Sequence, residues 1–183
     1  MTLAVLVYVV YRVAVSLPVL RWPFAGGLLA IAGDTADLLL RDVLAQGGIG
    51  GLGDYQLLDK LLDQVYLALF LVVALRWSGV ERNVALALYL YRLVGVGLFV
   101  ISGERVILLV FPNVFETWFL LVALLHHRRE PVSWTTPALA LALGGVTALK
   151  LLHEWALHGA RVFDAYTTSG FLDAVWRWLT GAR

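Results

Sequence analysis

Acidic residues gather in one stretch of an otherwise apolar chain. Of 13 acidic residues, six lie between Ile31 and Tyr66, and they are Asp34, Asp37, Asp42, Asp54, Asp59 and Asp63. An Asp at the centre of a membrane helix costs roughly 2.5 to 3.5 kcal/mol on insertion scales. Because the flanking sequence is apolar, we expect these carboxylates to form a functional site that binds an ion, a proton or a metal.

Helical spacing places these acids on two shared faces. At 3.6 residues per turn, Asp34 and Asp37 lie on one face, and Asp59 and Asp63 lie one turn apart on another helix. Ionised carboxylates this close repel each other, so the second pair needs a metal ion, a proton or a cation from another helix. The predicted protein partners of that pair are Arg41 and Arg92.

A third polar face is predicted near the end of the chain, where Lys150, Glu154 and His158 recur every four residues. Arg12, in the first apolar segment, is expected either to snorkel or to form a structural ion pair. We expect the three faces to converge in one internal network, because the cations and the acids predicted at membrane depth nearly balance in number. The predicted polar site consists of Asp34, Asp37, Asp59, Asp63, Arg92, Glu116, Lys150, Glu154 and His158.

Carboxylates presented by two helices to a common space are typical of Mg²⁺ or Ca²⁺ sites. The candidate metal ligands are Asp37, Asp59 and Asp63, and no catalytic residue is assigned. His153 and His158 lie five residues apart and point to different faces, which argues against zinc. The chain has no cysteine, which excludes thiolate metal sites, cysteine catalysis and disulfides.

The aspartate spacing partly resembles the signature of the CDP-alcohol phosphatidyltransferases, D-x2-D-G-x2-A-R-x8-G-x3-D-x3-D. The matching positions are Asp34, Asp37, Gly51 and Asp59, and the departures are Leu38, Arg41, Asp42 and Tyr55. The resemblance implies a six-helix membrane enzyme whose aspartates hold a metal. Tyr55 stands where that family has an aspartate used in its chemistry, so half of the motif is missing.

The elements that must position these residues are apolar helices. The chain is 61% hydrophobic and 15% charged, with a mean hydropathy of +0.83, which is typical of a polytopic membrane protein. We predict an all-α bundle forming a single transmembrane domain over 1–183, with an amphipathic helix at 170–183. The predicted spans are 3–20, 24–44, 54–77, 83–102, 104–126 and 135–158. The count is five if 24–44 is re-entrant, and Pro112 is expected to kink the span that contains it.

Composition and charge also limit the function. The net charge of +1 does not favour nucleic acid as a partner, and the N-terminal segment lacks the features of a cleavable signal. We expect an integral protein of a prokaryotic cytoplasmic membrane, with its orientation left open by the spread of basic residues. Because no catalytic motif is complete, cation- or proton-linked transport is the leading hypothesis. The alternatives are a metal-dependent enzyme acting on a lipid or isoprenoid phosphate, and a non-catalytic subunit of a homo-oligomer or larger membrane complex.

Overall fold

The computed structural model describes residues 3–46, 55–104, 106–128 and 133–154, together with 177, 180 and 181. For residues 4, 37–46, 55–60 and 154 it describes the course of the helix but not the side chains. Every regular element in this described part is helical, which confirms the predicted all-helical class. The predicted amphipathic helix at 170–183 lies almost wholly outside the described residues.

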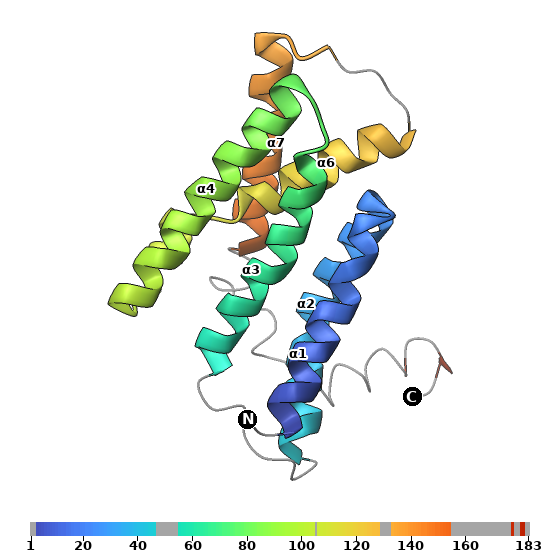
Figure 1. The fold of residues 1–183 in the computed structure, drawn as a ribbon, viewed down its shortest axis with the longest axis vertical. Helices are drawn as coiled ribbons and strands as arrows, with labels where there is room; N and C mark the ends of the chain where they lie inside the picture. The colour runs from blue at the N-terminus through green and yellow to red at the C-terminus, as the bar shows by residue number, and fades with distance from the viewer. Residues whose placement is uncertain are drawn as a thin grey trace.

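The elements alternate in direction along the bundle (Figure 1). In order they are α1 (Leu3–Ser16), the 3₁₀ turn η1 (Leu17–Leu20), α2 (Pro23–Gln46), α3 (Tyr55–Ala74), α4 (Gly79–Ser102), α5 (Val106–Val110), α6 (Val114–Arg128) and α7 (Thr136–Glu154). α1, α2 and α3 pack against one another, and α4 packs on α3. α6 runs obliquely across the bundle, contacts α2, α3 and α4, and carries α7 on another face.

Three described segments are long and apolar enough to cross a membrane. They are Gly79–Ser102, Val106–Arg128 taken across the break between α5 and α6, and Thr136–His153. The apolar helices Val5–Leu20 and Leu61–Ala74 are shorter. These lengths and compositions are compatible with an integral membrane protein, and the count of five to six spans stays a prediction.

Aromatic side chains form the centre of the core where α3 meets α6. Phe70 and Phe119 are fully buried and stack with their ring centroids 4.2 Å apart. Trp77 stacks on the other side of this pair, 5.3 Å from Phe119. The outer faces of α4 and α7 are apolar and exposed, with Ile101 at 86% and Leu141 at 80% of full exposure. A bundle that is apolar outside and packed inside suits a lipid environment.

The helix break at Phe111–Asn113 separates α5 from α6, so the kink predicted at Pro112 is a full interruption. Proline has no N–H to donate, and the carbonyls around it need other donors. Side chains of α4 supply them, because Tyr91 Oη donates to Val110 O at 2.5 Å and Arg92 Nη1 donates to Phe111 O at 2.7 Å. α4 approaches this closely at Gly95, where any Cβ would overlap the Phe111 side chain.

Candidate functional site

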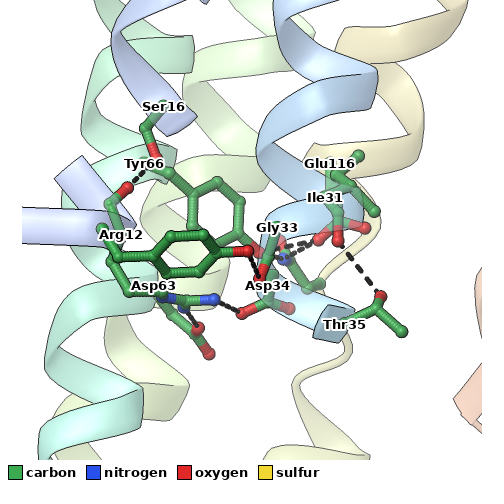
Figure 2. Close-up of polar contacts among 11 residues, drawn as sticks. Arg12, Ser16, Ile31, Gly33, Asp34, Thr35, Asp63, Tyr66 and Glu116 are labelled. Carbon is green, nitrogen blue, oxygen red and sulfur yellow. Dashed lines mark hydrogen bonds and ion pairs between the residues drawn. The ribbon is translucent and has the colours of Figure 1, made fainter. Parts of the chain in front are cut away.

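The first polar group of the interior, named here the Arg12 cluster, consists of Arg12, Asp34 and Asp63. Arg12 Nη1 donates to Asp34 Oδ1, and Arg12 Nη2 lies 2.6 Å from Asp63 Oδ1 (Figure 2). The three residues come from α1, α2 and α3, so one guanidinium joins three helices. The Arg12 and Asp63 side chains are 3% and 10% exposed, whereas the Asp34 side chain is 33% exposed. The cluster is therefore buried at Asp63 and open to the surroundings at Asp34.

Close packing of α1 on α2 sets this geometry. Gly33 faces Val15 so tightly that a Cβ on the glycine would lie 2.7 Å from the valine Cγ2. Beside this contact, Tyr11 Oη donates to Gly33 O at 3.2 Å. Ser16 Oγ donates to Arg12 O at 2.6 Å, one turn along α1. Because Asp34 directly follows Gly33, the close approach of the two helices delivers its carboxylate to Arg12.

The second group, named here the Glu116 cluster, consists of Tyr66, Asn113, Glu116 and Lys150. Glu116 Oε2 accepts from Tyr66 Oη at 2.9 Å and from Asn113 Nδ2 at 2.8 Å. Lys150 Nζ donates to Glu116 Oε1 at 3.3 Å. All four residues are buried, and Glu116 lies in the first turn of α6, where the helix dipole favours an anion. The carboxylate is thus surrounded by donors on both of its oxygens.

Tyr66 connects the two clusters. The Arg12 guanidinium carbon lies 5.8 Å from the centroid of the Tyr66 ring, within the range of a cation–π contact. The hydroxyl of the same tyrosine bonds Glu116. Figure 2 shows the ring lying among the polar side chains of both groups. Polar groups therefore follow one another from Asp34 through Arg12 and Tyr66 to Glu116, and on to Lys150.

The structure brings four of the predicted site residues into these clusters, namely Asp34, Asp63, Glu116 and Lys150. Arg92 is one of the two cations predicted for the Asp59 and Asp63 pair. It donates instead to Phe111 O, and the described cation that bonds Asp63 is Arg12. Among the other predicted residues, the side chains of Asp37, Asp59 and Glu154, and all of His158, lie outside the described residues. The same holds for the second predicted partner, Arg41.

Sequence reasoning gave too little weight to Arg12, Tyr66 and Asn113. A single arginine in an apolar segment carries no spacing signal that identifies its partners. Asn113 reads as part of the interruption next to Pro112, and its contact with Tyr66 spans 47 positions. The one available signal was that Tyr66 continues the helical face of Asp63 at i+3.

A metal site remains a prediction. Within the described ranges, no group of three or more His, Asp or Glu side chains is arranged to hold a metal ion. Two of the three candidate ligands, Asp37 and Asp59, have side chains outside those ranges. The third, Asp63, is engaged by Arg12.

A separate polar cluster joins the start of α4 to the end of α6. Glu81 Oε2 lies 2.8 Å from His126 Nε2, and its Oε1 accepts from Trp134 Nε1 at 2.9 Å. The backbone carbonyl of Glu81 accepts from Trp118 Nε1 at 3.2 Å. These contacts fasten one end of the bundle and share no residue with the Arg12 or Glu116 clusters, so Glu81 offers a matched control for changes in either.

Compared with family models, curated proteins and solved structures, the chain matches none of them. The partial aspartate motif is thus not accompanied by a match to a family model. Any proposal about function depends on the two buried clusters and on the helix break beside them.

Proposed function

We propose that this protein carries out proton-linked transport across a membrane. The observation that supports it is the series of ionisable and hydroxyl groups from Asp34 to Lys150 inside an apolar bundle, in which the Tyr66 ring contacts Arg12 and its hydroxyl bonds Glu116. Buried Asp and Glu side chains at membrane depth are typical members of proton relays. The apolar outer faces of α4 and α7 support the same location.

Asp34 and Asp63 form the proton-accepting end of this series. Both carboxylates bond the same guanidinium, so binding of a proton by one of them relieves their mutual repulsion. The partial exposure of Asp34 gives the proton access from outside the bundle. From there the Tyr66 hydroxyl lies next to Glu116, a second carboxylate that can exchange a proton.

The proposed topology has six spans. They are formed by α1 with η1, α2, α3, α4, α5 with α6, and α7, and the alternating directions of these helices in Figure 1 support it. In this arrangement the α5–α6 span is discontinuous. Broken helices next to buried charges are a recurrent construction in transporters, because the interruption lets the backbone line a binding site.

A liposome assay tests the proposal. The full chain is reconstituted with a pH-sensitive dye inside, and an inside-negative potential is imposed with potassium and valinomycin. We expect acidification of the lumen, reduced at least about tenfold by Asp63→Asn and by Glu116→Gln, because each removes a carboxyl that can carry a proton. Glu81→Gln, a carboxylate change outside both clusters, should keep the wild-type rate. Equal rates in all four proteins and in empty liposomes would refute the proposal.

A metal-dependent enzyme is the second candidate. It is favoured by the packing of α2 on α3, the two helices that carry the aspartates of the partial motif. Here the test is the unfolding temperature with Mg²⁺ or Mn²⁺. A rise that Asp59→Asn abolishes supports the enzyme, whereas a response to pH without a response to either metal supports transport.

A further inference from the structure

Arg92 is a buried cation without an acidic partner in the part of the chain that the structure describes. The residue is 6% exposed, and Nη1 donates to Phe111 O. Its Nε is buried and has no acceptor among the described residues. Arg12, by contrast, engages two carboxylates. Among the described residues only the Phe111 carbonyl compensates this guanidinium, and a buried guanidinium favours an anion in its surroundings.

The position of Arg92 strengthens this point. Its bond to Phe111 places the guanidinium at the helix break, directly before the N-terminus of α6. The first N–H groups of a helix have no intrahelical acceptor, and the dipole there favours negative charge. α6 has 15 residues, long enough to carry this effect. The guanidinium and the positive end of α6 therefore both favour negative charge at the helix break.

Asn113 adds a second unsatisfied atom at the same break. Its Nδ2 donates to Glu116 Oε2, which fixes the orientation of the amide, and its buried Oδ1 accepts from no donor in the described part of the chain. Asn113 is 5% exposed. Arg92 Nε is thus a buried donor and Asn113 Oδ1 a buried acceptor beside the same helix break, and a ligand that satisfies both needs an anionic oxygen and an O–H or N–H group.

We propose that the α5–α6 break binds a small carboxylate that carries a neighbouring hydroxyl or amino group. The Nε edge of Arg92 receives the carboxylate, since a guanidinium binds a carboxylate with two parallel bonds, and Asn113 Oδ1 accepts from the hydroxyl or amino group. The first turn of α6 stabilises the negative charge. This inference rests on the proposed function and names its cargo: Asn113 also bonds Glu116, so an occupied break contacts the proton series directly.

Thermal unfolding of the full chain in detergent tests the site. The probes are lactate, glycolate and serine, with acetate as the matched carboxylate lacking the second group, phosphate as a different oxyanion, and chloride at equal ionic strength. At ten times its Kd, a fitting probe should raise the midpoint by about 3–6 °C. We expect acetate to bind at least about tenfold more weakly. A larger response to phosphate, or the same response to chloride, would overturn the assignment.

Variants locate the site on Arg92. Arg92→Lys keeps a cation at the break but removes the fork, so it should weaken lactate binding at least about tenfold. Arg82→Gln, an exposed arginine on the same helix, should bind as the wild type does. Unchanged binding in Arg92→Lys would overturn the inference. If that variant does not fold, amide exchange of the wild type decides, because lactate should slow exchange at residues 113–117 and the absence of slowing excludes the site.

The outcome separates this inference from the proposed function. Lactate binding that depends on Arg92 without any proton flux would preserve the site and refute transport. Proton flux that depends on Glu116, with no probe bound, would preserve transport and refute the site. If both hold, a lactate gradient should drive acidification of the lumen, and Arg92→Lys should reduce this flux.

Discussion

Replacing Arg12 by leucine should be the most damaging single change in the interior. The substitution removes the guanidinium that both Asp34 and Asp63 bond. Removing one partner of a buried ion pair costs about 3–5 kcal/mol, because the remaining charge stays buried and unpaired. Asp63, with its side chain 10% exposed, accounts for most of this cost, whereas Asp34 at 33% is partly solvated and contributes less. For a chain of 183 residues, such a loss lowers the unfolding midpoint by about 6–20 °C.

The measurement is thermal or denaturant unfolding of the purified protein, with Arg21→Leu as the control. Arg21 is exposed, and its replacement should change stability by no more than about 0.5 kcal/mol. Adding Asp63→Asn to Arg12→Leu should restore much of the loss, since the uncompensated charge is then gone. A loss below about 1 kcal/mol in Arg12→Leu, or no recovery in the double variant, would refute the electrostatic account of the Arg12 cluster.

Three further changes test the neighbouring contacts. Lys150→Leu should cost about 3 kcal/mol or more by leaving Glu116 without its cation, and unfolding curves of Lys150→Leu with and without Glu116→Gln measure the coupling. Tyr66→Phe removes the bond donated to Glu116 and the longer, 3.5 Å bond accepted from Asn113, and it should cost about 1 kcal/mol in the same assay. It should slow proton flux in liposomes far more than that loss explains, and an unchanged flux would exclude the hydroxyl from the relay. Gly95→Ala should lower the unfolding midpoint, because the added Cβ would overlap Phe111. Gly97→Ala has open space around it and should be neutral or slightly stabilising. Equal midpoints in the two variants would show that the stability does not depend on the close approach of α4 to Phe111.

Much of the fold could be predicted from apolar periodicity and from helix-breaking residues. The interruption at Pro112 follows from the missing N–H of proline, and its approximate place could be predicted from sequence. That the helix is fully interrupted there could not be predicted, because a full break requires donors from another helix for the freed carbonyls. Tyr91 and Arg92 supply these donors from α4, and the local sequence does not reveal this tertiary packing.

For the candidate site, the residues could be predicted better than their partners. Helical spacing identified Asp34, Asp63, Glu116 and Lys150 as charged groups in apolar helices. Their pairing depends on which helices become neighbours, and Arg12 meets Asp63 across 51 positions of sequence. The number of basic residues at membrane depth made several pairings equally plausible, so only the packing of α1 between α2 and α3 selects among them.

Under the proposed six-span topology, the pairing of Arg12 with Asp34 also bears on how the chain would enter the membrane during synthesis. Neither Leu3–Ser16 nor Pro23–Gln46 is among the described helices that are long and apolar enough to span alone. Arg12 and Asp34 form an ion pair beside the hydrogen bond from Tyr11 to Gly33, where the two helices pack closely. We expect the two helices to leave the translocon as a hairpin, with Arg12 and Asp34 already neutralised against each other. When α3 enters next, Asp63 can bond the guanidinium of Arg12, which already lies in the bilayer. The order of synthesis then matches the order in which the cluster can assemble.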